Sequence, residues 1–428
     1  MSISRDFRTI KKMLDDPRYS QIILPIQANT TVTLPVGSGP HNDHKAFPDH
    51  LVTIQSLRDE VLVLNSLQRP KKITIVGSNG KTYGLLCKPK DDLRKDCRFM
   101  EFNMMVNRLL KKDAAARKKQ LHIRTYAVVP LSGDSGIVEW VDNTKLLRVI
   151  LQGLYAEYKK GMTKTETKNT FAKLQQIKQH TLAKQKPAEF IKLFKNTMLA
   201  RHPPVLSEWF RRTFPDPSSW FTARQKYTQT TAVISMVGYV VGLGDRHAEN
   251  IMFDLTNGET VHVDFDCLFE KGESFDWPEK VPFRLTHNLV DAFGVTGVEG
   301  TFRLSCVDTM RVMRNEKDSL LSVLNSFVHD PLVEWAKPEK RGYQVDRGRQ
   351  NTRSEAHMKD KAQEIMKTIE KKLNGQMGKN AHAKLPISTE GQVPIICYYA
   401  FRIHPYSLSP YLLLLYWGEV SQKFALGS

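Results

Sequence analysis

The chain has 428 residues, of which 41% are hydrophobic and 25% are charged, as in ordinary globular proteins that bury a large core. Its formal net charge of +18 suits nucleic acid, a membrane surface or an acidic partner. The 5 cysteines are scattered without a Cys-x-x-Cys pair, which argues against a disulfide framework or a zinc site and indicates a reducing compartment. The first residues lack the apolar core of a signal peptide, and before residue 390 no apolar stretch is long enough to span a bilayer.

The N-terminal part of the sequence predicts strands followed by one helix. Residues 1–70 begin with a short helix-like segment at 7–14 and continue into loops rich in Pro, Gly, His and Asn. Residues 71–90 predict a β-hairpin, because apolar residues alternate on both sides of the tight turn Gly77-Ser78-Asn79-Gly80. Residues 91–112 then predict a helix with one apolar face and two aspartates at its N-terminus.

The remainder of the sequence predicts two further strands and then mostly helices. The strands are expected at residues 122–130 and 136–141. Helical periodicity dominates residues 143–243, where Pro203-Pro204 and Pro215 interrupt it. Because strands come first and helices follow, the order is that of a bilobal α+β fold, with a small β-rich lobe and a larger helical lobe.

Two short motifs at the junction of these halves carry the strongest chemical signal. Asp245 and Asn250 lie in Gly-Leu-Gly-Asp-Arg-His-Ala-Glu-Asn (242–250), and Asp264 lies in Val-His-Val-Asp-Phe-Asp (261–266). Phosphoryl-transfer kinases need this order, because the first Asp orients the attacking hydroxyl and accepts its proton, while the Asn and the second Asp hold metal ions. Gly-Asp turns and Asp-Phe strand ends also occur by chance, but two motifs in the correct order favour the kinase interpretation.

The hairpin and the helix after it predict the side of the site that receives ATP phosphates. Lys88 lies on the return strand, and Asp91 and Asp96 are both candidates for an acid that holds it in place. Ser78 and Gly80 in the turn would lie over the phosphates, where backbone N–H groups approach closely. A surface lysine in a polar turn is the alternative, and the place of Lys88 in the chain order favours the functional role.

Gly80-Lys81-Thr82 imitates the end of a phosphate-binding P-loop, but that motif needs a glycine where Ile75 stands. We therefore exclude a P-loop nucleotidase. The strand end Glu139-Trp140-Val141 predicts the hinge between the lobes, with backbone groups bonding adenine and Trp140 contacting the ring face. Core packing is the alternative role for this tryptophan.

Longer phrases of the sequence resemble the phosphatidylinositol 3-kinase-related protein kinases, and among them the ATR type of checkpoint kinase. The resemblance runs from about residue 50 to residue 392. The phrases that carry it are Cys-Lys-Pro-Lys-Asp-Asp-Leu-Arg-Lys-Asp (87–96), Leu-His-Ile-Arg-Thr-Tyr-Ala-Val (121–128), Arg-His-Pro-Pro (201–204), Phe-Pro-Asp-Pro-Ser-Ser-Trp (214–220), Met-Val-Gly-Tyr (236–239), Gly-Leu-Gly-Asp-Arg-His (242–247), Pro-Phe-Arg-Leu-Thr-His-Asn (282–288) and His-Asp-Pro-Leu-Val-Glu-Trp (329–335).

The resemblance implies a role for each motif residue. Asp245 is expected as the catalytic base, His247 as the group that stabilises the transferring phosphate, Lys88 as a contact of the ATP phosphates, and Asn250 and Asp264 as Mg²⁺ ligands, with Mn²⁺ as an alternative ion. The implied activity is phosphorylation of Ser or Thr followed by Gln on nuclear proteins, in signalling of DNA damage and replication stress. The implied partners are an ATR-interacting subunit and activator proteins, with DNA met only indirectly and no membrane.

The resemblance also divides the chain into five expected parts. They are an N-terminal extension leading into the small lobe (1–70), the small lobe with the hinge (71–142), the large lobe with the catalytic and activation loops (143–335), a polar regulatory linker (336–392) and an atypical tail (393–428).

Four features depart from the pattern or add to it. Ala248 stands where the family usually has Gly or Pro, and the family's long helical-repeat N-terminus is not present in this sequence. Residues 336–384 are rich in Lys, Arg, Gln and Asn and predict a linker with one charged helix at about 358–374. Residues 393–428 do not resemble the family's C-terminal FATC domain, so we expect an atypical tail in its place.

Two alternatives from other functional classes stay open at this point. A phosphoinositide lipid kinase shares both motifs, but an excess of acids in the segment that meets the substrate would repel an anionic headgroup. The charged residues of that segment are Glu270, Glu273, Asp276 and Glu279 against Lys271 and Lys280. Lys-rich stretches at 158–195 and 336–372 suit an inactive kinase-like fragment that acts as a basic binding or scaffold module, although solvated helix faces and a linker explain them as well.

Overall fold

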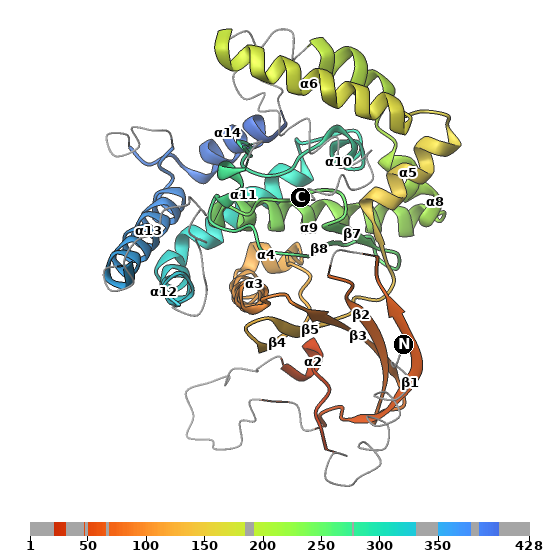
Figure 1. The fold of residues 1–428 in the computed structure, drawn as a ribbon, viewed down its shortest axis with the longest axis vertical. Helices are drawn as coiled ribbons and strands as arrows, with labels where there is room; N and C mark the ends of the chain where they lie inside the picture. Colours follow the sequence, from red (N-terminus) through yellow and green to blue (C-terminus); the bar gives the residue numbers. More distant parts are fainter. Residues whose placement is uncertain are drawn as a thin grey trace. The chain divides into compact units, whose positions relative to one another are not determined.

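The computed structural model of the chain describes residues 21–30, 47, 50–65, 68–184, 192–275, 278–330, 350–377 and 385–401. The chain divides into two compact units. The first consists of Met1–Glu101 and Thr125–Asp142, and the second of Phe102–Arg124 and Asn143–Ser428. The helix expected at residues 7–14 lies outside the described residues. The predicted α+β class is confirmed by a β-sheet in the first unit and a mostly helical second unit (Figure 1).

The first unit is built on a five-stranded antiparallel sheet whose strand order is β1-β2-β3-β5-β4. The strands are β1 (Ile54–Val63), β2 (Lys71–Gly77), β3 (Thr82–Pro89), β4 (Val128–Ser132) and β5 (Ser135–Glu139). The hairpin predicted at residues 71–90 is confirmed as β2 and β3, which pair from Lys71 opposite Cys87 to Val76 opposite Thr82.

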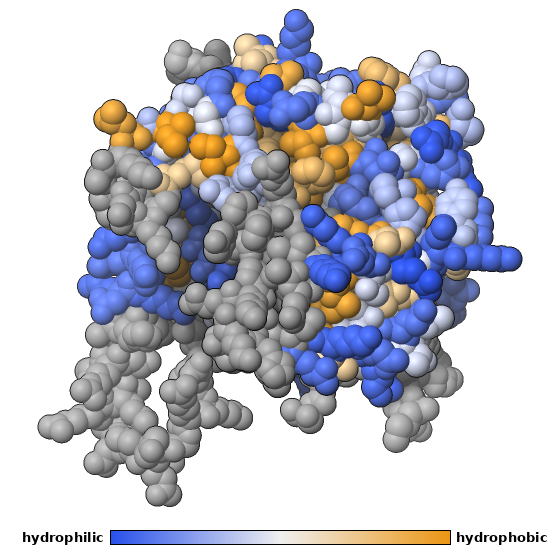
Figure 2. All heavy atoms as spheres, turned by 90° about the horizontal axis from the view of Figure 1, so that it is seen from above, coloured by the Kyte–Doolittle hydropathy of each residue, from blue (hydrophilic) through white to orange (hydrophobic). Residues whose placement is uncertain are grey.

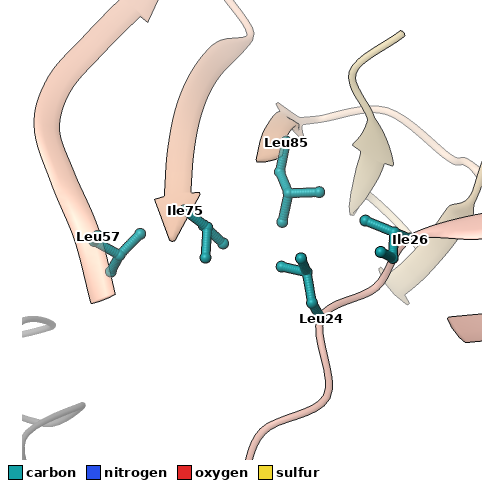
Figure 3. Close-up of a cluster of buried hydrophobic side chains, with 5 residues drawn as sticks. All are labelled: Leu24, Ile26, Leu57, Ile75 and Leu85. Atoms are coloured by element: carbon teal, nitrogen blue, oxygen red, sulfur yellow. The ribbon is translucent and has the colours of Figure 1, made fainter. Parts of the chain in front are cut away.

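The core of the first unit lies on one face of this sheet. Leu57, Ile75 and Leu85 project from three neighbouring strands and pack with Leu24 and Ile26, which come from the segment before the sheet (Figure 3). That segment includes the short helix α2 (Gln27–Thr30). The buried Asn29 fixes it in place, because its amide nitrogen donates to the Leu24 and Val52 carbonyls at 2.8 and 2.9 Å. Residues far before the predicted hairpin therefore complete its hydrophobic core.

One predicted strand is shorter than expected. Residues 122–127 were predicted as part of a strand, but only Val128–Ser132 pairs in the sheet. The Asn107 side chain forms hydrogen bonds with both backbone groups of Ile123. It donates to the Ile123 carbonyl at 2.8 Å and accepts the Ile123 N–H at 2.7 Å. Because these groups are bonded to a side chain, they are not offered to a neighbouring strand.

The second unit consists mainly of helices around α9 (Pro217–Val241), which runs beside α11 (Thr301–Asn315) (Figure 1). The helix predicted at residues 91–112 is confirmed as α3 (Arg94–Lys112), which begins in the first unit and continues into the second. The other helices before the C-terminal region are α4 (Ala114–Lys118), α5 (Leu147–Glu157), α6 (Lys164–Lys184), the π-helix η1 (Phe194–Leu199), α8 (Leu206–Thr213), the 3₁₀ helix η2 (Lys271–Ser274), α10 (His287–Asp291) and α12 (Lys317–Val328).

The helical interpretation of residues 143–243 is correct except at its start. The short strand β6 (Thr144–Leu146) pairs with β7 (Ile251–Asp254), which pairs in turn with β8 (Thr260–His262). The two proline breaks are confirmed, because helices end before Pro203-Pro204 and before Pro215. Helix α9 then begins after Asp216, whose side chain accepts the Ser219 N–H at 2.9 Å as an N-cap.

Two helices follow in the described part of the C-terminal region. The charged helix predicted at about 358–374 is α13, which spans Gln350–Leu373 and so begins earlier than expected. Helix α14 (Thr389–Phe401) runs through Val393, where the atypical tail was expected to start, and packs against α11. The Arg314 guanidinium on α11 donates to the Ile387 carbonyl at 2.7 Å and to the Gln392 side chain at 3.2 Å.

In the described part of the chain, no helix is long and apolar enough to cross a membrane. On the face shown in Figure 2, hydrophobic side chains lie among hydrophilic ones.

Candidate active site

The catalytic motif begins where α9 ends at Gly242. This glycine has φ +65° and closes the helix, since the following Leu243 N–H donates to the Gly238 carbonyl at 2.8 Å. A Cβ atom at Gly242 would lie 2.6 Å from the Glu270 backbone nitrogen. Glycine is therefore required both for the left-handed backbone and for the close approach of the segment around Glu270.

Both aspartates of the motif adopt left-handed backbone conformations, with φ +56° at Asp245 and φ +64° at Asp264. Such a conformation costs about 1–2 kcal/mol in a residue with a side chain, although Asp tolerates it better than most. The buried Arg246 holds both regions, since its guanidinium donates to the carbonyls of Gly244 at 2.9 Å, of Val263 at 2.9 Å and of Asp264. One side chain thus fixes the relative position of the two aspartates within the second unit.

Asn250 is tied into the same network. Its side-chain nitrogen donates to the backbone carbonyl of Asp245 at 2.9 Å. The backbone carbonyl of Asn250 accepts the Val263 N–H at 3.1 Å. Because the amide nitrogen is used in this way, the amide oxygen is the atom that can serve as a metal ligand. Asp264 is exposed, and its carboxylate is close enough to raise the pKa of Asp245.

These oxygen donors fit a small divalent cation. Within the described residues, no group of three or more His, Cys, Asp or Glu side chains could hold a metal ion. A carboxylate and an amide oxygen without a full protein cage are what Mg²⁺ uses when nucleotide phosphates supply further ligands. The residues therefore fit a metal that arrives with a nucleotide.

His247 is held in one tautomer by its neighbour. The Glu249 backbone N–H donates to His247 Nδ1 at 3.2 Å, so Nδ1 is an acceptor and the neutral ring carries its proton on Nε2. Burial lowers the pKa of His247 and outweighs the opposing charge of Asp245, so the site favours the neutral ring. The Nε2–H group is consequently the donor that this ring can offer to a substrate.

Burial raises the pKa of Asp245 above its usual value, and the nearby charge of Asp264 acts in the same direction. His247 and Arg246 oppose that change. A carboxylate with a raised pKa is a better proton acceptor than an ordinary aspartate, which suits a general base. Asp245 and His247 thus have the character of a base beside a neutral hydrogen-bond donor.

Sequence reasoning missed two residues that support this loop. The Glu279 carboxylate accepts the Asp245 N–H with both oxygens, at 2.8 and 3.0 Å, and Arg284 donates to the Arg246 carbonyl at 3.2 Å. Glu279 was counted among the acids that meet the substrate, and that interpretation is wrong because its side chain is buried. No local pattern reveals this contact, since 34 positions separate the two partners.

The hairpin turn of the first unit is anchored to the residue before β1. The Ser78 N–H donates to the Thr53 carbonyl at 2.9 Å, and the Ser78 hydroxyl accepts the Thr53 N–H at 3.1 Å. Gly80 has φ +73°, and no atom lies within 4 Å of the position that a Cβ would occupy there. The turn therefore offers an open glycine backbone, as the phosphate-binding prediction requires.

Lys88 lies on β3 with its ammonium group 3.0 Å from the Asp91 carboxylate. Both side chains are largely shielded from solvent, with exposed fractions of 20% and 24%. Asp96 is buried in the first turn of α3. Asp91 thus forms an ion pair with Lys88, and the role of Asp96 stays a prediction.

The hinge prediction needs a correction for two of its backbone groups. The Glu139 N–H donates to the Ala127 carbonyl at 2.8 Å, and the Trp140 N–H donates to the Gly84 carbonyl at 2.9 Å. These two N–H groups are thus used inside the first unit and cannot donate to adenine, whereas the role of Val141 stays a prediction. The Glu139 carboxylate is also structural, since it accepts the N–H groups of Gln27 and Ala127 at 2.7 and 2.8 Å.

Known proteins resemble the chain over most of its length. A model of the phosphatidylinositol 3- and 4-kinase family matches residues 82–337. The chain is 43% identical over 396 residues to protein kinase rad3 of Schizosaccharomyces pombe, and 45% identical over 401 residues to serine/threonine-protein kinase ATR of Oryza sativa subsp. japonica. Both alignments cover 92% of this chain, but only 15% and 14% of those proteins, so the chain spans about one seventh of their length.

A solved structure shows the same fold. The FAT and kinase domain of CtTel1 superposes with a TM-score of 0.72 and 31% identity, covering 90% of this chain and 25% of that one. Together with the family match, this confirms the resemblance noted from the motifs. The chain belongs to the phosphatidylinositol 3- and 4-kinase family, and it groups there with the ATR, rad3 and MEC1 protein kinases.

Proposed function

We propose that the chain is the catalytic part of an ATP-dependent serine/threonine protein kinase of the ATR type. The observation that carries the proposal is the network that holds Asp245, Asn250 and Asp264 together through Arg246. The relatives named ATR, rad3 and MEC1 support it, because their names describe protein kinases. The proposed targets are Ser or Thr residues followed by Gln on nuclear proteins that signal DNA damage and replication stress.

Each residue of the catalytic loop has a proposed role in the transfer. Asp245 orients the hydroxyl of the substrate and accepts its proton, and its raised pKa suits that task. His247 donates from Nε2 to the oxygens of the transferring phosphate, where negative charge develops. Asn250 and Asp264 hold Mg²⁺, or Mn²⁺ in its place, and the metal neutralises charge on the nucleotide phosphates when it is bound.

The first unit supplies contacts to the nucleotide itself. Lys88 binds ATP phosphates as a compact cation, and its ion pair with Asp91 directs the ammonium group. The backbone of Ser78 and Gly80 covers the phosphates. Trp140 contacts the adenine face, with Val141 as the remaining hinge residue.

A protein substrate is favoured over a lipid, although the charge argument is weaker than the sequence suggested. Of the four acids counted at residues 267–281, Glu279 is buried and Asp276 lies outside the described residues. Glu270 is exposed but pairs with Lys372 at 2.7 Å. The names of the relatives therefore support a protein substrate more strongly than the local charge does.

The proposed setting is the nucleus. The partners would be protein substrates, an ATR-interacting subunit and activator proteins, while DNA would be met through those proteins. The net charge of +18 supports recruitment near nucleic acid.

The test is transfer of radiolabelled phosphate from ATP by this chain in three parallel reactions with Mg²⁺. The substrates are a Ser-Gln peptide, the same peptide with Ser-Ala, and vesicles that contain phosphatidylinositol. We expect label only on the Ser-Gln peptide, and none when EDTA removes the metal. Label on the vesicles would establish a lipid kinase instead, and nucleotide binding without any transfer would support the inactive scaffold.

A further inference from the structure

We propose that Glu279 is a positioning residue for the catalytic loop, because its buried carboxylate holds the backbone of Asp245 in the left-handed conformation that transfer requires. The inference rests on the proposed kinase function for its consequence, although the contact itself can be tested without any activity. Glu279 lies in the segment 267–281, which the sequence indicated only as a surface that meets the substrate.

The contact is short and shielded from water. Both Glu279 oxygens accept the Asp245 N–H, at 2.8 and 3.0 Å, and the glutamate is 9% exposed. A hydrogen bond from a backbone N–H to an ionised carboxylate is stronger than one between neutral groups. The bond acts on Asp245 itself, whose φ of +56° needs such support.

Two glycines form the notch that receives the carboxylate. A Cβ atom at Gly244 would lie 2.3 Å from Glu279 Oε2, and one at Gly272 would lie 2.4 Å from the same atom. Neither approach is compatible with a larger residue, so the carboxylate could not stay where it is. The notch therefore depends on glycine in the catalytic loop and in η2.

The local fold delivers Glu279 to this notch. The Glu279 N–H donates to the Gly272 carbonyl at 2.9 Å, which links Glu279 directly to the helix η2. The same segment is tied to the end of α9, because the Glu270 N–H donates to the Gly242 carbonyl at 2.9 Å. Movement of this segment would consequently withdraw the carboxylate from Asp245.

A cavity of about 250 Å³ borders the contact, and Gly244, Gly272 and Glu279 are among its lining residues. If the carboxylate is removed, water in this cavity can reach the Asp245 N–H. The first test therefore measures hydrogen–deuterium exchange of peptides covering residues 243–250 in the wild type and in Glu279→Ala. We expect exchange to rise by about tenfold there, with no change in peptides from α11.

The second test measures steady-state transfer to the Ser-Gln peptide. In Glu279→Ala we expect kcat to fall by on the order of 100-fold, because misplacing a reacting group has that cost. The KM for ATP should stay within about threefold, since no ATP contact is removed. Glu279→Gln keeps one acceptor oxygen and should recover part of the loss, to about tenfold below the wild type.

A matched control separates positioning from the general loss of a carboxylate. Glu166 also accepts a backbone N–H, that of Thr163 at 2.8 Å, at the exposed start of α6. Glu166→Gln should leave kcat and KM within about twofold of the wild type.

A double-mutant cycle with Gly272→Ala tests whether Gly272 and Glu279 act through the same contact. The three atoms nearest to a Cβ at Gly272 all belong to the Glu279 side chain. Gly272→Ala should therefore lower kcat in the wild type and add almost nothing in Glu279→Ala, a coupling that independent sites do not show. Gly272→Ala also tests the proposal if Glu279→Ala fails to fold.

The outcomes distinguish this inference from the proposed function. A wild-type chain that transfers no phosphate would refute the proposed function, and the exchange measurement would still decide the role of Glu279. Unchanged exchange at residues 243–250 in Glu279→Ala would overturn the inference. An active wild type with equal kcat in Glu279→Ala, or additive effects in the cycle, would overturn it as well.

Discussion

The proposed catalytic loop of the second unit and the β2–β3 hairpin of the first unit are held in shape by different interactions. In the loop, Arg246, Asn250 and Glu279 bond their side chains to backbone groups around two aspartates with left-handed backbones. In the hairpin, regular strand pairing carries the shape, and side chains add bonds such as that from the Thr53 N–H to the Ser78 hydroxyl. The loop thus depends on individual side chains, whereas the hairpin depends on a repeating pattern.

The difference teaches where single substitutions should matter. Removing one side chain from the loop leaves buried carbonyls without donors, which is costly. A side chain on the hairpin can be changed with little effect on strand pairing, because the ladder is made by the backbone. The following predictions test this contrast.

The largest effect is expected for Asp264→Ala. Transfer to the Ser-Gln peptide should fall on the order of 1,000-fold, because a metal ligand next to the phosphates is lost. Asp264→Asn should fail in the same assay while keeping the left-handed backbone, since Asn tolerates that conformation. Asp266→Asn, two positions along, should stay within about threefold of the wild type. Turnover of Asp264→Ala at the wild-type rate would remove this residue from the site.

Arg246→Lys should destabilise the second unit by about 3 kcal/mol, because an ammonium group cannot reach three carbonyls as the guanidinium does. Urea unfolding followed by circular dichroism measures this. Arg211→Lys is the control, since Arg211 makes an exposed ion pair with Glu208 and should cost less than about 0.5 kcal/mol. Equal losses in the two variants would contradict the contrast.

Glu259 leads to a prediction of how the free energy of unfolding depends on pH. Burial raises its pKa, but the hydrogen bond from His122 and the charges of His122, Arg124 and Lys226 together lower it to about 2. A depressed carboxyl pKa stabilises the folded state above the unfolded value near 4.5, and this stabilisation is lost as pH falls toward 2. Because the three cations are partly exposed, we expect a contribution of about 2 kcal/mol.

Unfolding of the wild type and Glu259→Gln at pH 7 and at pH 2.5 checks this prediction. The gap between their unfolding free energies should be largest at pH 7 and shrink at pH 2.5. Glu157→Gln is the control, because Glu157 pairs with Arg212 at the surface. A gap that is the same at both pH values would show that the charge of Glu259 does not stabilise the fold.

The smallest effect is expected for Lys72→Met on the hairpin. The Lys72 ammonium lies 4.3 Å from the centre of the Trp140 ring, an interaction of about 0.5 kcal/mol. The KM for ATP should change by about twofold if Trp140 contacts adenine. Lys71→Met changes the neighbouring residue on the opposite face of the strand and should leave the KM for ATP unchanged. A large loss from Lys72→Met would mean that hairpin side chains matter as much as those of the loop.

The sequence predicted those parts of the fold that follow from short-range patterns. The hairpin at 71–90 followed from alternation and a glycine turn, and α9 followed from helical periodicity after the break at Pro215. The strand β6 was missed because three residues are too few to show a period. The loss of strand structure at residues 122–127 depends on Asn107, and no local signal reports that contact.

The same limit applies to the candidate site. Asp245, Asn250 and Asp264 were found because their spacing matches that of a catalytic motif, and the structure brings them into one network. Glu279 was assigned to the surface because composition alone cannot tell a buried acid from an exposed one. Such contacts join residues that are distant in sequence, so only the folded backbone reveals them.

The most direct test of the account compares ATP affinity and phosphate transfer in Asp245→Asn. Asn keeps the left-handed backbone and its N–H bond to Glu279, but it cannot accept the proton of the substrate hydroxyl. The account predicts an ATP dissociation constant within about threefold of the wild type and a transfer rate lower by on the order of 1,000-fold. Equal losses of binding and transfer, or full transfer by Asp245→Asn, would contradict the claim that this loop carries the chemistry.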